Sequence, residues 1–380
     1  RPVRGEHCHL IGEDGTRYLD FASGIAVNLL GHSHEGLISA IQQQAATLMH
    51  VSNFFSNPVA TEAAMKINTL MRNAGAGDGQ VFFCNSGAEA NEAAIKVARK
   101  FGGRGRHAVI TAYGSFHGRT LAALAATGQP AKHEPFQPMP DGFRHVPFGD
   151  LDALRATVDA SCAAVLIETV QGEGGVIPAS KEYLQGIRSL CDERGLLMMI
   201  DEVQTGMART GEWFGFQHAG VVPDVVTLAK ALGNGFPVGA CWAKQEVAAV
   251  FQPGDHGSTY SGTAIAGAAI CAVINQMRDI NAPVLARDKG LYLAEELSKV
   301  AGVVEVRGQG LLRAVELGPN RDAKAVYLEL LNEGVVTNAV NATSLRLAPP
   351  ITVSIAEMDE VIAKIATVLA KGVGLTATPA

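Results

Sequence analysis

Short, unbroken apolar runs recur through the middle of the chain, and segments with helical spacing separate most of them. A continuous apolar run of this kind suits a strand that is buried on both faces. Because such runs alternate with helical patterns, as at residues 88–100 and 179–194, the chain predicts an α/β fold with a mainly parallel central sheet covered by helices. The predicted strands are residues 81–84, 108–112, 163–167, 196–200, 225–229 and 239–243.

The two ends of the chain have a different pattern. Residues 8–11 and 17–21 predict a β-ribbon, and apolar positions between 37 and 48 have helical spacing. From about residue 281 onward, helices and strands are mixed as in an α+β unit. We therefore expect one large domain and a smaller α+β domain built from both termini. The expected boundaries are residues 1–50 and 281–380 for the small domain and 51–280 for the large one.

A carboxylate and an amine follow two of the apolar runs. Asp201 comes directly after residues 196–200, and Lys230 directly after residues 225–229. Ligands of open α/β sheets bind at the carboxyl ends of strands, so both side chains are expected to face one small molecule. Pyridoxal phosphate (PLP) needs both groups, an amine for its aldehyde and a carboxylate for its ring nitrogen. Taken singly, a strand-end Asp and a surface Lys are ordinary features.

An anion site is predicted where residues 85–87, Asn-Ser-Gly, join the strand 81–84 to the helix 88–100. Such a turn directs backbone N–H groups and a helix N-terminus at whatever lies in it. The alternative is an ordinary helix cap by Asn85 or Ser86, since the same residue types serve both purposes.

Further polar loops follow other predicted strands. In residues 114–119, Phe116 has the shape to stack on a flat ring and Arg119 the fork to clamp a carboxylate. Residues 168–175 bring Glu168 and Glu173 to the same edge, where either carboxylate suits an ammonium or another cation. A structural Phe, a solvated Arg and solvated loop acids are the simpler interpretations.

Two more segments complete the candidate chemistry. Residues 256–263 form a polar loop with hydroxyl groups and glycines that suits a phosphate. Arg346 lies between Leu345 and Leu347, so on a strand it faces away from both and toward the predicted crevice. A surface arginine is the alternative.

Composition narrows the class of protein. The 380 residues carry a formal net charge of −6 and are 47% hydrophobic, as in a globular enzyme with a large core. No long Lys/Arg run indicates nucleic acid or an anionic membrane as a partner, and the most apolar helical stretch, residues 264–274, is too short to span a bilayer. The six cysteines have no CxxC pair, which favours a reducing, cytoplasmic location. His7-Cys8-His9 contains residue types that bind metals, but we expect no metal there, because neighbouring residues of an extended segment point to opposite sides.

Together and in this order, these segments resemble the class III (ω-amino-acid) aminotransferases of PLP fold type I, most closely those that act on acetylornithine. The resemblance covers nearly the whole chain. Its most specific matches are residues 82–93, 116–119, 201–206 and 228–232.

The resemblance implies a role for each cofactor residue. Lys230 would form the Schiff base with PLP and then move the substrate proton, and Asp201 would pair with the ring nitrogen. Thr259 would reach the phosphate from the neighbouring subunit, which makes the expected assembly a homodimer with shared active sites. The residues expected to contact the cofactor are Ser86, Gly87, Ala88, Phe116, His117, Asp201, Val203, Gln204, Lys230 and Thr259.

The resemblance also implies different roles for the residues expected to contact the substrates. These residues are Arg119, Glu168, Glu173, Ser258 and Arg346. Arg119, with Ser258 nearby, would hold the α-carboxylate of an ω-amino donor such as N2-acetylornithine. Arg346 would hold the α-carboxylate of 2-oxoglutarate, and Glu173 would pair with Arg346 when the donor is bound. The expected reaction gives a semialdehyde and glutamate, a step of arginine biosynthesis.

Several alternatives stay open. Succinylornithine, ornithine, 4-aminobutyrate and lysine are other ω-amino donors. A PLP aminomutase, decarboxylase or epimerase is a second enzyme class, and a binding module without catalysis is a third interpretation. The chain also departs from the family pattern at Thr169, Ala208, Asn234 and residues 261–263, which bear on the shape of the substrate pocket.

Overall fold

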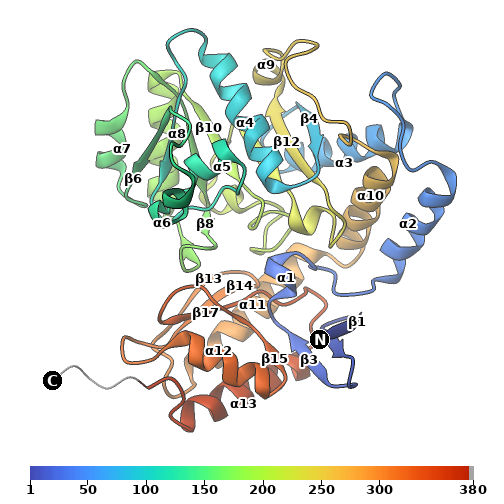
Figure 1. The fold of residues 1–380 in the computed structure, drawn as a ribbon, viewed down its shortest axis with the longest axis vertical. Coiled ribbons are helices and arrows are strands. Elements are labelled where there is room, and N and C mark those ends of the chain that lie inside the picture. The colour runs from blue at the N-terminus through green and yellow to red at the C-terminus, as the bar shows by residue number, and fades with distance from the viewer. Residues whose placement is uncertain (376–380) are drawn as a thin grey trace.

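The computed structural model describes residues 1–375 and has an upper and a lower part (Figure 1). A seven-stranded sheet forms the upper part, in the order β4-β12-β11-β10-β7-β5-β6. Its strands are β4 (Gly79–Cys84), β5 (Ala108–Ala112), β6 (Phe143–Val146), β7 (Cys162–Glu168), β10 (Leu197–Asp201), β11 (Val225–Leu228) and β12 (Gly239–Lys244).

Most neighbours in this sheet are parallel, and β12 is antiparallel to both β11 and β4. Successive residues of β10 alternate between two apolar clusters, Met198 and Ile200 in one and Leu197 and Met199 in the other. Helix α4 (Gly87–Gly102) covers the second cluster and α8 (Lys181–Arg194) the first. The sheet is therefore buried on both faces, as its continuous apolar strands predict.

The lower part joins the two ends of the chain. One sheet has the order β1-β2-β3-β15, in which β15 (Val335–Val336) pairs in parallel with β3 (Arg17–Asp20). The other has the order β13-β14-β17-β16. The remaining strands are β1 (Pro2–Glu6), β2 (His9–Gly12), β13 (Glu305–Gln309), β14 (Leu312–Glu316), β16 (Asn338–Ala339) and β17 (Ser344–Leu347).

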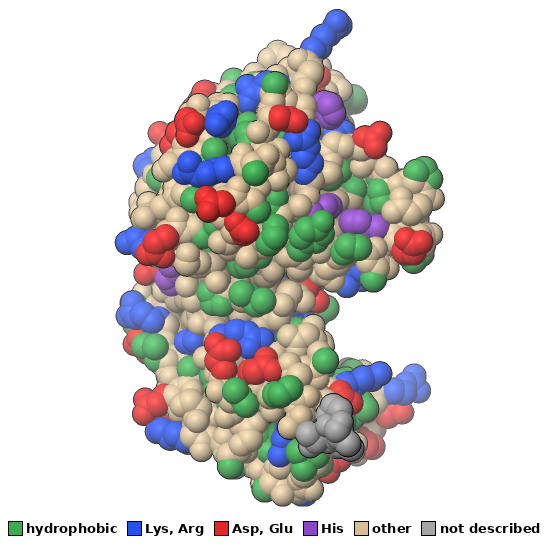
Figure 2. Space-filling model, turned by 90° about the vertical axis from the view of Figure 1, so that its left-hand side faces the viewer, with side chains coloured by type: hydrophobic (Ala, Val, Ile, Leu, Met, Phe, Trp, Pro, Cys, Tyr) green, Lys and Arg blue, Asp and Glu red, His purple; other side chains and the backbone are tan. Residues whose placement is uncertain are grey.

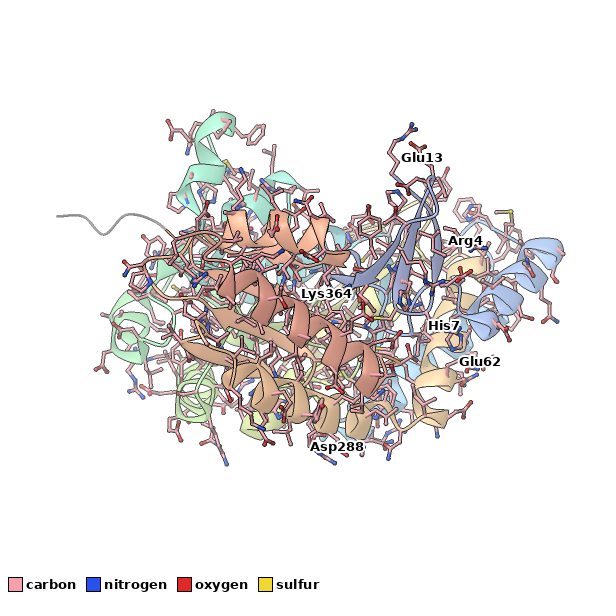
Figure 3. All side chains as sticks on the ribbon, turned by 90° about the horizontal axis from the view of Figure 1, so that it is seen from below. Arg4, His7, Glu13, Glu62, Asp288 and Lys364 are labelled. Atoms are coloured by element: carbon pink, nitrogen blue, oxygen red, sulfur yellow. The ribbon has the colours of Figure 1, made fainter. Side chains whose placement is uncertain are left out.

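Helices complete both parts. Seen from below, α13 (Ile355–Ala370), which carries Lys364, lies beside α11 (Ala282–Ser298), which carries Asp288, and the ribbon with Arg4, His7 and Glu13 lies next to them (Figure 3). Other helices are α2 (Glu35–Thr47), α3 (Pro58–Asn73), α10 (Ala264–Asp279) and α12 (Ala323–Asn332). Shorter ones are α1 (Ser23–Ala26), α5 (Leu121–Ala126), α6 (Pro130–His133), α7 (Leu151–Thr157), α9 (Gln245–Ala248) and the 3₁₀ turns η1 (Glu134–Phe136), η2 (Gly215–Ala219) and η3 (Lys230–Leu232).

The surface matches the mild net charge. On the face that Figure 2 shows, Lys and Arg side chains are interspersed with Asp and Glu, and the surface is indented between the upper and lower parts. Among the described residues, no helix combines the length and the apolar character needed to cross a membrane.

The predicted fold class is confirmed, and two details were not predicted. Strand β6 is only half-buried and carries Arg144 and His145, so it lacks the apolar run that marked the other strands. The reversed direction of β12 does not show in its apolar pattern, because a doubly buried strand looks the same in either direction. The domain boundaries stay a prediction; α2, within the expected N-terminal segment, packs against α10 of the upper part.

Close backbone packing between α11 and the loop before β14 gives a stability prediction. A Cβ on Gly290 would lie 1.9 Å from the carbonyl oxygen of Gly310, so G290A forces the helix and the loop apart. We expect the free energy of unfolding to fall by about 1–3 kcal/mol, measured by urea denaturation. The matched control is L291A in the same helix, at a residue that is 60% exposed; equal stability of the two variants would contradict the packing argument.

Candidate active site

A cavity of about 380 Å³ opens at the carboxyl ends of the parallel strands and reaches the N-terminus of α4. It collects side chains from segments far apart in the sequence. Of the residues predicted from the sequence, those that line it are Ser86, Gly87, Ala88, Phe116, His117, Arg119, Glu168, Glu173, Asp201, Val203, Gln204 and Lys230.

Asp201 is the last residue of β10 and is 4% exposed, and several hydrogen bonds hold its carboxylate in the cavity. Its Oδ2 atom accepts hydrogen bonds of 2.8 Å from Asn91 Nδ2 and 2.8 Å from His117 Nδ1. Its Oδ1 atom accepts one of 3.0 Å from the Val203 amide. A buried carboxylate with this many donors is held in one orientation and remains a strong acceptor for a cationic group.

Lys230 follows β11 and begins the turn η3. Its backbone has a φ of 46°, a left-handed conformation that is uncommon for residues with a side chain. Burial, and next the positive charge of Arg346, lowers the pKa of the Lys230 amine from 10.5 to about 8. A larger share of this amine is therefore neutral and nucleophilic near neutral pH than for an exposed lysine.

The turn before α4 contains one of the two features that the sequence suggested, a helix cap, while the anion site stays a prediction. The Ser86 side chain caps the helix by accepting a hydrogen bond of 3.2 Å from the Glu89 amide, so the capping interpretation is correct. Gly87 and Ala88 also line the cavity at the first turn of a helix of 16 residues, where backbone N–H groups favour an anion. A Cβ on Gly87 would lie 2.8 Å from Val203 Cγ1, so the close approach of these segments requires glycine.

Phe116, Arg119 and Glu168 form one wall. The Arg119 guanidinium carbon lies 5.5 Å from the centre of the Phe116 ring, in the range of a cation–π contact. Glu168 accepts a hydrogen bond of 3.2 Å from the Phe116 amide. Burial, and next the charge of Asp201, raises the pKa of the Glu168 carboxyl well above its usual value, which favours its protonated form beside Asp201.

Arg346 on β17 approaches from the lower part and is 2% exposed. Its Nη1 atom lies 2.6 Å from Glu173 Oε1 and 3.3 Å from Gln204 Oε1. Because Glu173 and Gln204 line the cavity and Arg346 does not, these side chains stand between the guanidinium and the cavity. The predicted pairing of Arg346 with Glu173 is present.

Besides Arg346, two predicted residues do not line this cavity. Ser258 Oγ lies 3.3 Å from Asn85 Nδ2, in the turn before α4. Neither Ser258 nor Thr259 lines the cavity. Thr259 is exposed. One chain alone therefore does not bring these hydroxyl groups to its own cavity.

The sequence reasoning missed Asn91, which connects several parts of the site. Besides Asp201, its Nδ2 atom donates 2.7 Å to the carbonyl of His117, and its Oδ1 atom accepts 2.8 Å from Thr227 Oγ1. Its spacing was a usable signal, since a residue four positions after Gly87 lies on the same helix face. The wall formed by Val27 and residues 235–238 had no polar signal and was also missed.

Comparison with known proteins agrees with this geometry. The family model "Aminotransferase class-III" matches residues 1–369. The chain belongs to the class-III aminotransferases. It is 46% identical to the acetylornithine aminotransferase of Gloeobacter violaceus over 97% of this chain and 92% of that protein.

Solved structures of aminotransferases share the fold. The ornithine aminotransferase of Toxoplasma gondii, which has partial occupancy of PLP at its active site, has a TM-score of 0.91 and 29% identity, over 97% of this chain and 90% of that one. The N-acetylornithine aminotransferase of Stenotrophomonas maltophilia has a TM-score of 0.84 and 31% identity, over 98% and 95%. The residues of this aminotransferase fit the same cofactor, because the cavity offers a buried amine, a buried carboxylate and a helix N-terminus.

The lowered pKa of Lys230 gives a direct prediction. In the cofactor-free protein, acetylation of Lys230 should rise through a pKa of about 8, because only the neutral amine reacts and burial favours that form. Competitive labelling followed by peptide mass spectrometry measures it residue by residue. R346M removes a positive charge that lowers this pKa, so it should move the midpoint toward 10.5; a midpoint near 10.5 in the unaltered protein would contradict the burial of the amine.

Proposed function

We propose that this aminotransferase moves the ω-amino group of N2-acetylornithine to 2-oxoglutarate, giving the semialdehyde and glutamate in arginine biosynthesis. The observation that carries the proposal is the ion pair of 2.6 Å between Arg346 and Glu173 beside Lys230. An enzyme that takes alternately a donor without a carboxylate near the cofactor and an acceptor with one needs a cation that can be covered and uncovered. The acetylornithine aminotransferases among its relatives support the choice of donor.

The cavity residues have separate tasks in this proposal. When bound, PLP supplies an aldehyde for amino groups and an electron-withdrawing ring. Asp201 holds the proton of the ring nitrogen, in an orientation fixed by Asn91 and His117. The Lys230 Nζ atom would hold the cofactor and, once released from it, would remove and return the substrate proton; burial, which lowers the pKa of this amine in the cofactor-free protein to about 8, favours the neutral form that a base needs. Gly87 and Ala88 bind the phosphate group with their backbone N–H groups.

Two arginines select the substrates. Arg119, packed on Phe116, holds the α-carboxylate of the donor and leaves the distal amine to enter. Glu173 neutralises Arg346 during this half of the reaction, so no free cation opposes the incoming ammonium group. The α-carboxylate of 2-oxoglutarate then takes the place of Glu173 on Arg346, in the bidentate geometry that guanidinium groups favour.

We also propose a homodimer in which the Thr259 hydroxyl reaches the phosphate of the partner subunit. The support is an exposed apolar edge beside Thr259, which we call the aromatic edge. The segment around residues 48–55 contacts the loop that carries Thr259. The ring centres of His50 and Tyr260 lie 5.7 Å apart, and Asn53 Nδ2 donates a hydrogen bond of 3.1 Å to the Ser258 carbonyl. Exposed apolar side chains grouped in this way are typical of interfaces. The aromatic edge consists of Leu48, Met49, Phe54, Phe55 and Tyr260.

The location is proposed as cytoplasmic. The six cysteines are all free and buried, as in proteins of a reducing compartment.

The dimer prediction is tested at the aromatic edge. Phe54 and Phe55 are 93% and 66% exposed, so F54D/F55D should leave the subunit folded but place charge in the interface. Sedimentation velocity should show monomers and the transaminase rate should fall at least about tenfold, because Thr259 no longer reaches a partner. V304D, at an apolar residue of the lower part that is 69% exposed, is the control. An intact dimer in the double variant would contradict the proposed interface.

The donor is tested by initial rates with 2-oxoglutarate. N2-acetylornithine should exceed ornithine, 4-aminobutyrate and lysine in kcat/KM by at least about tenfold, since each group recognised in a pocket is worth about 1–3 kcal/mol. Succinylornithine should come second, because it keeps the acyl group and the α-carboxylate. Glutamate formation is the measurement. A higher rate with another donor would identify that donor as the substrate. Repeated turnover of the donor without 2-oxoglutarate, beyond one equivalent per active site, would indicate an aminomutase, decarboxylase or epimerase.

A further inference from the structure

The loop that carries Glu173 is a strained turn with little support of its own. It connects β8 (Val170–Gln171) to β9 (Ile177–Pro178), a hairpin held by two residue pairs. Gly175 has a φ of 115° and Val176 one of 54°. A positive φ is unfavourable for a β-branched residue and persists only where the surroundings impose it. Something outside the hairpin therefore holds this turn in place.

Arg307 on β13 supplies that hold. Its Nε atom donates a hydrogen bond of 2.9 Å to the carbonyl oxygen of Gly175. The rest of the guanidinium is fixed from behind, by Glu316 Oε2 at 3.0 Å and Ser344 Oγ at 2.7 Å. Ser344 also donates 2.5 Å to the same Glu316 oxygen. The Arg307 side chain is 15% exposed, and that of Glu316 19%, so these contacts lie largely out of water, where they are stronger.

Two arginines of one sheet, β13-β14-β17-β16, therefore hold the turn by hydrogen bonds near both of its ends. Arg346 donates 3.2 Å to the carbonyl of Gly172 and pairs with Glu173, while Arg307 holds Gly175. Ser344 and Arg346 lie two residues apart on β17, so they share one face of the strand. Directly after Gly175, Val176 is fully buried against Leu312 and Ala314 of β14. The position of the Glu173 carboxylate is thus set relative to the strand that carries its arginine.

We propose that Arg307 is a positioning residue that sets how firmly Glu173 covers Arg346, and thereby the balance between the two substrates. This inference rests on the proposed alternation of a donor and an oxo acid. When an oxo-acid carboxylate displaces Glu173, the contacts of Arg346 with Gly172 and Glu173 break, but the hydrogen bond from Arg307 to Gly175 remains. The turn keeps its strained form, and Glu173 returns to Arg346 after the product leaves.

Loss of Arg307 should therefore change the KM values for the two substrates in opposite directions. The turn relaxes, Glu173 spends less time on Arg346, and the uncovered cation attracts carboxylates and opposes the ammonium group of the donor. In R307M, the KM for 2-oxoglutarate should fall and the KM for the donor should rise. The ratio of kcat/KM for the donor to kcat/KM for 2-oxoglutarate should drop about tenfold.

The two half-reactions, measured separately by stopped flow on the cofactor-loaded enzyme, test this change. The control is R321M. Arg321 also donates to backbone carbonyls of the lower part, those of Val373 and Leu369, and within residues 1–375 it has no hydrogen bond to the hairpin. R307K keeps the charge but lacks the planar fork, and should give an intermediate ratio. A ratio within about twofold of the unaltered enzyme in both R307M and R307K overturns the proposal.

Hydrogen exchange gives a readout that does not depend on turnover. Amides of peptides covering residues 170–178 should exchange faster in R307M than in the unaltered protein, with no such change in R321M. If R307M does not fold, E316Q weakens the support behind Arg307 and should produce the same shifts to a smaller extent; unchanged exchange and an unchanged ratio there contradict the proposal. Failure of the proposed function would appear differently, as absence of transamination in the unaltered enzyme.

Discussion

One buried carboxylate organises this structure. Asp201 ends a strand in the middle of the sheet, and its oxygens are held by Asn91, His117 and the Val203 amide. A charge at such depth is stable only if its donors are in place. The N-terminal part of α4, the loop after β5 and the segment after β10 must therefore converge on this point. Their convergence forms the cavity, whose walls include the N-terminus of α4, the Phe116 ring and the Lys230 amine.

The remaining charges of the cavity balance one another. Burial raises the pKa of Glu168 and lowers that of Lys230, so both groups are shifted toward their neutral forms. Arg346 pairs with Glu173; burial acts to raise the pKa of the Glu173 carboxyl, but the charge and hydrogen bond of Arg346 bring that pKa below its usual value. This ion pair joins a loop of the upper part to β17 of the lower part. The hairpin held by Arg307 lies at this junction.

Much of this arrangement was predictable from the sequence, and the reasons are physical. Doubly buried strands leave continuous apolar runs, so the chain order placed Asp201, Lys230, Phe116 and Glu168 at one edge of a sheet. The direction of β12 and the role of Asn91 depend on pairing and on contacts between distant segments, which local patterns do not encode. Thr259 is exposed and does not line the cavity of its own chain, so a single chain does not test its predicted contact with the phosphate.

The proposed transaminase function depends most on Lys230 as the amine that would hold the cofactor. Reduction of the PLP-loaded enzyme with borohydride, followed by peptide mapping, tests this directly. The account predicts that the pyridoxyl group is found on Lys230 and that K230A carries none. A label on another lysine, or stoichiometric labelling of K230A, would contradict it.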